Sequence, residues 1–406
     1  MNKQAILRDM KAKKLPVIIS GAGVVGKVLL DLCRQEGIAV EGFCDSSVKV
    51  AHSDFCGFKV LYTPDLKTKY EDAAILISVA AIKDVVDLLQ NLGFENWYAG
   101  GLLLEDLDVS QEDPGAGIDY PKFAIENCIM CHRGYLNPDQ LFLRSIDLII
   151  TERCSLRCKD CSNLMQYYKK PKNCDTGMLL KSIDALFSVA DEVMDLRIIG
   201  GEAFMNREWP IIVKRLTEEP KAKRVVLYTN GTILPNGDDV QYLKNQKVLV
   251  IITDYGALSK KLVELVEILR SNGIAHHVLK IDDWLDCSSI TLHNRGVEQN
   301  KELYKLCCAK NMASLSDGKL FRCPYAANAV RLSAVPDYPG DYIDLFQEPL
   351  DEANILKTKE KVSDYLFHKD CLETCDFCNG RPLSGVEVKP AVQVDKPLDY
   401  YQYPTQ

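Results

Sequence analysis

Short apolar runs rich in Val, Ile and Leu alternate with amphipathic stretches along most of this chain. Apolar runs bounded by turn residues predict buried strands, and the stretches between them predict helices. The predicted strands are residues 16–20, 40–44, 60–62, 74–79, 146–151, 196–199, 225–229, 248–254 and 274–281. The predicted helices are residues 27–35, 82–92 and 176–190. This alternation is typical of α/β folds with parallel sheets.

The strands and helices fall into two series, separated by a stretch rich in Gly, Pro and Asp. We expect a Rossmann-like domain at 1–112, a linker at 113–139 and a second α/β domain at 140–300. A cysteine-rich domain at 301–385 and an extended tail at 386–406 complete the expected organisation. The tail is expected to carry no chemistry of its own.

The first series contains a G-x-G-x-x-G motif between its first strand and its first helix. The motif consists of Gly21, Gly23 and Gly26, and Asp45 follows the next strand, about where a ribose-binding acid would lie. A strand, a turn and a helix are the setting in which this motif binds dinucleotides. Three interpretations of the domain stay open, namely a scaffold, a nucleotide-sugar site and a nicotinamide-cofactor site.

Three cysteines follow the strand at 146–151 within one short loop. Cys154, Cys158 and Cys161 have the spacing C-x3-C-x2-C. Thiolates on so short a loop can bind three irons of a cubane cluster and leave the fourth iron open to another ligand. Zinc is the alternative, but zinc sites usually come as paired C-x2-C units, and this loop has no fourth Cys or His. The spacing favours a [4Fe–4S] cluster at the carboxyl end of a strand, where α/β barrels carry their chemistry.

Glycine or polar residues also end the next three strands. In chain order they are Gly200, Gly201 and Glu202, then Thr229 and Asn230, then Thr253 and Asp254. Adjacent glycines let a backbone approach a ligand closely. The Asn-Gly pair that follows the strand at 225–229 is a strong turn signal. The carboxyl ends of parallel strands meet at one rim, so we expect these groups near the cysteine loop.

In these motifs and their order the chain resembles the radical S-adenosylmethionine (SAM) superfamily over about residues 146–280. The resemblance implies a partial (β/α)6 barrel, similar to a TIM barrel, in which SAM chelates the open iron. It implies that residues 200–202 hold the SAM amino group through backbone and carboxylate, and that residues 229–231 lie beside the SAM ribose and methionine. An electron from the cluster then releases a 5′-deoxyadenosyl radical, which abstracts a hydrogen atom from the substrate.

A second set of cysteines lies in the last third of the chain. Cys308 and Cys323 enclose the spacing C-x9-G-x4-C, and a C-x3-C-x2-C group follows. The pattern resembles the auxiliary-cluster extensions of radical SAM enzymes called SPASM or twitch domains, with fewer cysteines than a full SPASM domain. The resemblance implies one auxiliary [4Fe–4S] cluster, and the expected ligands are Cys308, Cys323, Cys375 and Cys378. The alternative ligands are Cys371 and Cys307, and zinc is the alternative metal.

Composition narrows the class of protein further. The chain has 406 residues, 16 cysteines and a formal net charge of −8. An acidic chain is a poor match to nucleic acid, and the sequence has no run of about eighteen apolar residues that would predict a membrane span. Many cysteines without a signal peptide indicate reduced thiols, cluster chemistry and a cytoplasmic location. The resemblance implies a flavodoxin- or ferredoxin-type electron donor as a partner.

The N-terminal series also points to a class of substrate. Residues 43–46 and 57–61 resemble the Rossmann-like domain attached to sugar acyltransferases and other enzymes of bacterial surface-glycan assembly. This resemblance implies the oxidation, epimerisation or dehydration of a sugar or nucleotide-sugar. Two alternatives stay open: a radical SAM enzyme that modifies peptides or proteins, and a non-catalytic iron–sulfur redox protein.

Overall fold

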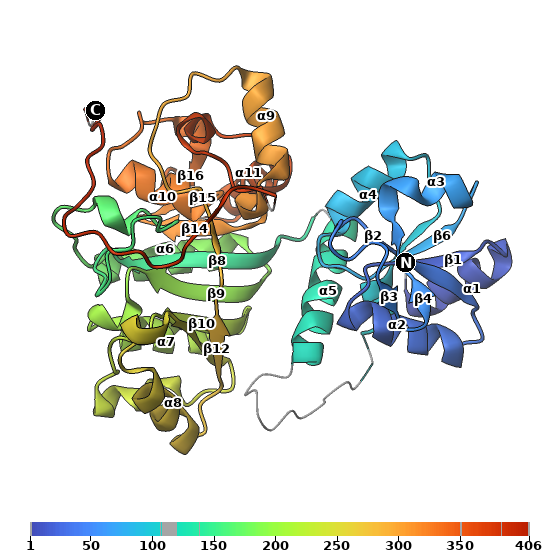
Figure 1. Ribbon diagram of the computed structural model, residues 1–406, viewed down its shortest axis with the longest axis horizontal. Coiled ribbons are helices and arrows are strands. Elements are labelled where there is room, and N and C mark those ends of the chain that lie inside the picture. The colour runs from blue at the N-terminus through green and yellow to red at the C-terminus, as the bar shows by residue number, and fades with distance from the viewer. Residues whose placement is uncertain are drawn as a thin grey trace. The chain divides into compact units, whose positions relative to one another are not determined.

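The computed structural model describes residues 2–105, 107, 120–137, 139–349, 351–382 and 384–404. The chain divides into two compact units, Met1–Phe142 and Leu143–Gln406 (Figure 1). Of the linker expected at 113–139, residues 113–119 and 138 lie outside the described residues. The remainder differs from the expectation, because residues 120–136 form a helix, α5 (Tyr120–Leu136), that belongs to the first unit.

A five-stranded sheet forms the core of the first unit, in the order β5-β2-β1-β6-β7. Its neighbouring strands pair in parallel. This is the order of a doubly wound sheet, in which the first strand lies in the middle and the chain extends to either side of it. The strands are β1 (Val17–Ser20), β2 (Val40–Asp45), β5 (Leu61–Tyr62), β6 (Ala74–Ile77) and β7 (Trp97–Ala99), with a hairpin of β3 (Asp54–Phe55) and β4 (Phe58–Lys59) before β5.

The helices of the first unit include three that the sequence pattern did not predict. They are α1 (Lys3–Lys13), α2 (Val24–Gln35), α3 (Leu66–Lys69), α4 (Ile82–Asn91) and α5. The unpredicted helices are α1, α3 and α5. Of these, α1 is largely polar and buries only Ile6, Leu7 and Met10. An apolar stripe this narrow gives a weak helical period, so packing on the rest of the unit decides that the helix forms.

His132 connects α5 to two loops of the first unit and is completely buried. Its Nδ1 accepts a hydrogen bond from the Gly101 N–H at 3.0 Å, so its Nε2 carries the proton and donates to the Val79 carbonyl oxygen at 2.9 Å. Burial lowers the pKa of this imidazole to about 4, because the charged form would lose its hydration.

We expect His132 to make the first unit less stable as the pH falls from about 6.5 to about 4. In this interval the unfolded state binds more protons than the folded state, and each pH unit lowers the free energy of unfolding by about 1.4 kcal/mol. A His132→Gln variant keeps an acceptor for Gly101 and a donor for Val79 without titrating. Urea unfolding at about pH 7.5 and about pH 5.5 should show a loss about 1.4 kcal/mol larger in the wild type. Equal losses in the two chains would contradict the prediction.

An eight-stranded sheet forms the core of the second unit, in the order β12-β11-β10-β9-β8-β14-β15-β16. Strands β9 to β12 pair in parallel with one another, as β8 does with β14, whereas β14, β15 and β16 pair antiparallel. The strands are β8 (Phe142–Thr151), β9 (Glu192–Gly200), β10 (Ala222–Thr229), β11 (Val248–Asp254), β12 (His276–Lys280), β14 (Ala313–Ser316), β15 (Lys319–Phe321) and β16 (Tyr342–Asp344). Since β12 and β16 are free edges of this sheet, it is open, as expected for a partial barrel.

Three helices follow strands of this sheet, and three belong to the cysteine-rich region. They are α6 (Thr176–Val189), α7 (Trp209–Glu218), α8 (Leu262–Ser271), α9 (Val297–Leu306), α10 (Pro324–Arg331) and α11 (Glu352–Phe367). The expected boundary near residue 300 lies within one compact unit, because β14 of the cysteine-rich region pairs with β8. The sequence Ala-Ser-Leu-Ser of β14 is half polar, so its period did not predict a strand that is buried throughout.

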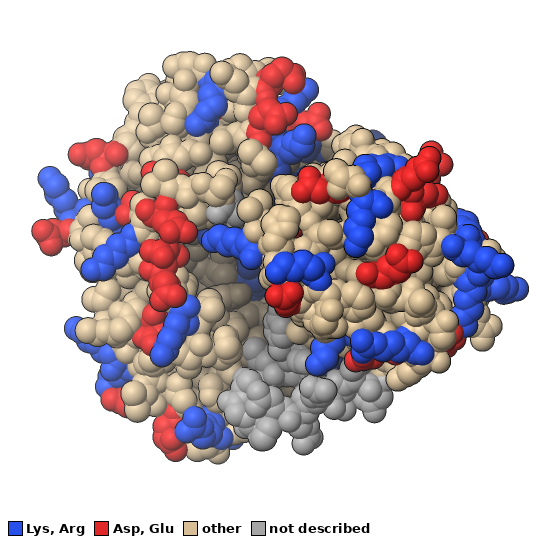
Figure 2. Space-filling view, turned by 45° about the vertical axis from the view of Figure 1, so that its right-hand side comes forward, with Lys and Arg blue, Asp and Glu red and all other residues tan. Residues whose placement is uncertain are grey.

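Among the helices in the described part of the chain, none combines the length and the apolar character that crossing a membrane requires. On the face that Figure 2 shows, Lys and Arg side chains lie interspersed with Asp and Glu side chains.

Candidate functional site

The three cysteines predicted to bind a cluster lie on the loop between β8 and α6. Cys158 is 7% exposed, and Cys154 and Cys161 are partly buried. Burial raises the pKa of all three thiols, that of Cys158 to about 11. Iron replaces the proton of a coordinating thiol, so three buried thiols on one loop fit an iron–sulfur cluster with three protein ligands.

Glu202 joins the end of β9 to the end of β10 and is completely buried. Its Oε1 accepts hydrogen bonds from the Thr229 hydroxyl at 2.8 Å and from the Phe204 N–H at 3.2 Å. Its Oε2 accepts one from the Asn230 N–H at 2.8 Å. Burial raises the pKa of this carboxyl to about 7, and the three donors oppose that shift. The carboxylate expected to hold the SAM amino group thus has protein donors on both oxygens and ties two strand ends together.

Asn230 extends this connection to the cysteine loop. Its Nδ2 donates to the Ser155 hydroxyl at 3.1 Å and lies 3.6 Å from the Cys154 sulfur. The Ser155 hydroxyl is also within 2.5 Å of the Thr232 hydroxyl. The cysteine loop and the ends of β9 and β10 therefore meet at one rim, as the sequence predicted. Ser155 was not predicted, because a serine beside a cysteine motif carries no signal of its own.

Gly200 and Gly201 are required by the protein's own backbone. A Cβ at Gly200, whose φ is +149°, would lie 2.1 Å from the Thr151 carbonyl oxygen. A Cβ at Gly201 would lie 2.2 Å from the Arg153 carbonyl oxygen and 2.8 Å from the Cys154 Cβ. The sequence interpretation was that these glycines make room for a ligand; the structure adds that they let β9 pass against the start of the cysteine loop.

The end of β11 reaches the same rim through Ser259. The Ser259 hydroxyl donates to the Asn230 carbonyl oxygen at 2.8 Å and lies 3.3 Å from the Thr253 carbonyl oxygen. Asp254 accepts the Gly256 N–H at 2.8 Å and so closes the turn after the strand. Burial, and then the charges of the three loop thiols, raise the pKa of the adjacent Tyr255. Ser259 and Tyr255 escaped the sequence analysis, although their position just after a strand end was a usable signal.

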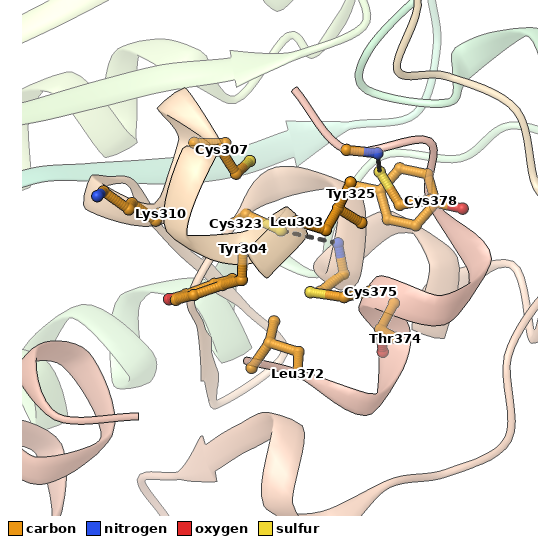
Figure 3. Close-up of a pocket in the computed structure, with 13 residues that line it drawn as sticks. Leu303, Tyr304, Cys307, Lys310, Cys323, Tyr325, Leu372, Thr374, Cys375 and Cys378 are labelled. Carbon is orange, nitrogen blue, oxygen red and sulfur yellow. Dashed lines mark hydrogen bonds between the residues drawn. The ribbon is translucent and has the colours of Figure 1, made fainter. Parts of the chain in front are cut away.

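Four cysteines of the second set line one pocket, shown in Figure 3. They are Cys307, Cys323, Cys375 and Cys378. The first follows the end of α9, the second precedes α10, the third lies in the turn η9 (Glu373–Phe377) and the fourth follows that turn. Cys307 was an alternative ligand in the sequence analysis, whereas Cys308 was the expected one. Cys308 and Cys371, by contrast, do not line the pocket. The C-x9-G-x4-C spacing selects Cys308, whereas of the two adjacent cysteines at the end of α9 only Cys307 lines the pocket.

Backbone donors are directed at two of these sulfurs. The Ala326 N–H, in the first turn of α10, lies 3.4 Å from the Cys323 sulfur, and the Gly380 N–H lies 3.3 Å from the Cys378 sulfur. Burial raises the pKa of Cys323 to about 12, and that of Cys375 and Cys378 in the same direction. N–H groups that donate to sulfur stabilise bound thiolates, as they do around iron–sulfur clusters. In the described part of the chain, no three His, Cys, Asp or Glu side chains stand close enough to hold one metal ion.

We expect a Cys307→Ala variant to lose about four irons per chain, one cluster's worth, after anaerobic reconstitution. Cys308→Ala is the matched control, since it removes an adjacent thiol that does not line the pocket. Iron and sulfide analysis of the two variants measures the difference. Loss of iron from the Cys308 variant alone would reverse the assignment.

The glycine motif of the first unit is also required by packing. A Cβ at Gly21, whose φ is +111°, would lie 2.5 Å from the Ser78 hydroxyl, and one at Gly26 would lie 2.2 Å from the Gly21 carbonyl oxygen. At Gly23 a Cβ would meet nothing within 4 Å. Asp45, expected to bind a ribose, accepts the Ala22 N–H at 3.1 Å and so holds the motif's own turn.

Comparison with known proteins places the cysteine loop and the following strands in a family. Residues 146–265 match the family described as a 4Fe-4S single cluster domain. The GTP 3',8-cyclase of Clostridium acetobutylicum is 31% identical over 96 residues, which are 23% of this chain and 30% of the cyclase. The match thus spans under a third of that protein's length.

Three solved structures show weaker similarity. BtrN in complex with AdoMet and 2-DOIA is 17% identical, with a TM-score of 0.41 over 64% of this chain and 99% of BtrN. Streptococcus suis SuiB bound to S-adenosylmethionine is 14% identical, with a TM-score of 0.31 over 72% of this chain and 60% of SuiB. The enzyme anSMEcpe with AdoMet and the Cp18Cys peptide is 13% identical, with a TM-score of 0.36 over 58% of this chain and 88% of its own.

The fold and the rim define an iron–sulfur protein built on an open α/β barrel. Residues 146–265, which carry the three-cysteine loop, thus match an iron–sulfur cluster family, and 96 residues of the chain are similar to the cyclase. The description of the matched family names one 4Fe-4S cluster, which is the cofactor expected at the three-cysteine loop.

Proposed function

We propose that this chain is an enzyme that cleaves SAM reductively and abstracts a hydrogen atom from a sugar or nucleotide-sugar, leading to oxidation, epimerisation or dehydration. The observation that carries the proposal is the meeting of the cysteine loop, Glu202 and Asn230 at one rim. A protein that only stores or transfers electrons has no need of Glu202 and Asn230 beside a cluster with an open iron.

Different residues of the rim would bind the iron and position SAM. Cys154, Cys158 and Cys161 would each bind an iron. When bound, the cluster and SAM supply the electron and the 5′-deoxyadenosyl radical. Glu202 holds the strand ends from which the backbone at 200–201 and the Asn230 side chain would position SAM. Tyr255, packed edge-on against Trp284 at 5.7 Å, would exclude water from this side of the rim.

The second cysteine pocket would hold an auxiliary [4Fe–4S] cluster. One apolar cluster of side chains contains Cys161 of the first site together with Cys323 and Cys378 of the second. Its other members include the buried Leu164, Met165 and Phe377. These apolar side chains would connect the two iron–sulfur clusters without intervening water. The connection supports oxidation of the substrate, because the auxiliary iron–sulfur cluster would accept the electron that remains after hydrogen abstraction.

Buried polar atoms on the sheet support a polyhydroxylated substrate. Asp147 on β8 is 1% exposed and pairs with Arg197 on β9, with 2.5 Å between Oδ1 and Nη2. Burial raises the pKa of this carboxyl, and the Arg197 and Arg381 guanidinium groups oppose the shift. Among the described residues, Asp147 Oδ2 and Arg381 Nε have no hydrogen-bond partner. Sugar hydroxyls both donate and accept hydrogen bonds, so they would satisfy both atoms.

The test is release of 5′-deoxyadenosine by the anaerobically reconstituted chain with SAM and dithionite, which replaces a flavodoxin- or ferredoxin-type donor. Stimulation by a mixture of nucleotide-sugars supports the whole proposal. Slow release that the mixture leaves unchanged would reject the substrate class and favour peptides. Absence of release from protein with full iron content would reject the enzyme assignment.

A further inference from the structure

The C-terminal segment crosses the second unit and pairs with the cysteine loop. We call residues 386–404 the C-terminal strap; Figure 1 shows it in red as an extended chain. It begins with β17 (Glu387–Val388), which pairs antiparallel with β13 (Trp284–Leu285). Beside the cysteine loop, the Lys159 N–H donates to the Val392 carbonyl oxygen at 2.7 Å, and the Val394 N–H donates to the Arg157 carbonyl oxygen at 2.9 Å. The strap therefore adds a short stretch of sheet to the loop on both sides of Cys158.

Gln393 lies at the centre of this pairing and contacts the loop with both ends of its amide. Its Oε1 accepts the Arg157 N–H at 2.8 Å. Its Nε2 lies 3.3 Å from the Cys158 sulfur and 2.8 Å from the Ala391 carbonyl oxygen, so it can donate to both. Ala391 is buried and has a φ of +55°, a conformation that L residues adopt at a cost of about 1 kcal/mol or more. Such a turn persists only when its surroundings specify it, so the position of the Gln393 amide is well defined.

Aromatic side chains hold the rest of the strap against both cysteine regions. The Tyr400 ring packs edge-on against Tyr167, just past the cysteine loop, at 5.6 Å. The Tyr403 ring packs edge-on against Phe377, the neighbour of Cys378, at 5.9 Å. Backbone hydrogen bonds from the Leu398 and Tyr403 N–H groups add to these contacts. The strap is therefore extended, as the sequence predicted, and it is packed as a part of the second unit.

We propose that the C-terminal strap completes the SAM-cluster site and that Gln393 is a positioning residue that donates a hydrogen bond to the Cys158 thiolate. The proposal rests on the proposed function, because it requires a cluster at Cys154, Cys158 and Cys161. A hydrogen bond to a cluster sulfur stabilises the reduced, more negative state and so raises the reduction potential. Gln393 thus makes the cluster easier to reduce, and it makes that property depend on the docking of the strap.

Two variants separate the hydrogen bond from the docking of the strap. Gln393→Glu keeps an oxygen that accepts the Arg157 N–H, but it replaces the donor with a negative oxygen beside Cys158. Gln393→Leu removes both contacts. Gln241→Leu is the control, because Gln241 is exposed and bonds only within its own turn, to the Asp238 carbonyl oxygen.

The measurement is the reduction midpoint potential of the reconstituted full chain, followed by electron paramagnetic resonance on the signal that SAM addition changes. At a fixed applied potential, the ratio of reduced to oxidised cluster should be about tenfold lower in both Gln393 variants than in the wild type. For a one-electron couple this corresponds to a midpoint potential lower by about 59 mV. The control should match the wild type. Hydrogen exchange at residues 392–398 establishes whether the strap stays docked in the Gln393→Glu variant.

An unchanged potential in the Gln393→Glu variant with a docked strap would overturn the role of the hydrogen bond. An unchanged potential and unchanged exchange in both variants would overturn the whole inference. A wild type that assembles no SAM-responsive cluster would instead reject the proposed function, so the two failures are distinguishable.

Discussion

Simultaneous replacement of Cys154, Cys158 and Cys161 by Ala should abolish SAM cleavage and remove about four irons from the reconstituted chain. The three thiols sit on one loop, and Asn230 connects that loop to the strand ends that would position SAM. Without them no iron is held at the rim, and neither the electron nor the chelating metal is present. The expected loss of activity is complete, because no other group on the rim replaces an electron donor.

Iron analysis and 5′-deoxyadenosine release check this prediction on the same preparations. The auxiliary pocket supplies an internal reference, since its four cysteines remain and about four irons should still bind. Cys174→Ala is the matched control: this thiol follows the loop, and the Asn206 side-chain nitrogen lies 3.9 Å from its sulfur. Retention of SAM cleavage by the triple variant would overturn the assignment of the loop.

A Gly201→Ala substitution should lower SAM cleavage at least ~100-fold, because displacement of catalytic groups by about 1 Å has effects of this size. The added Cβ would lie 2.2 Å from the Arg153 carbonyl oxygen, which is closer than any van der Waals contact. The Gly201 N–H donates to the Thr151 carbonyl oxygen at 2.9 Å, and the Glu202 N–H donates to the Arg153 carbonyl oxygen at 2.8 Å. Relief of the clash must therefore move either the end of β9 or the start of the cysteine loop.

Gly237→Ala is the control for this substitution, because a Cβ there would meet nothing within 4 Å. Iron content, SAM affinity and cleavage rate are measured for both variants. The Gly201 variant should retain the auxiliary cluster, which lies on other elements of the second unit. Normal SAM cleavage by this variant would mean that the rim adapts to the side chain, and it would contradict the close approach that the structure requires.

Local sequence patterns were sufficient for much of the barrel. The strands β8 to β12 were predicted because each is a run of apolar residues bounded by turn signals. The cysteine loop and the groups at residues 200–202 and 229–230 were predicted to meet because the carboxyl ends of such strands share a rim. The structure joins them through Glu202 and Asn230. These features depend on the spacing of residues within one segment, and the sequence alone shows that spacing.

Other features depend on segments that are distant in the chain. Gln393 reaches Cys158 across 235 positions, and β14 joins the barrel sheet by pairing with β8. That Cys307 and not Cys308 lines the pocket follows from how α9 ends against the turn that carries Cys375 and Cys378. The sequence by itself determined which chemistry is proposed for this protein, because cluster-binding and cofactor motifs are local. Only the tertiary structure decided which partner each group meets, because burial and hydrogen bonding between distant segments depend on how the whole chain packs.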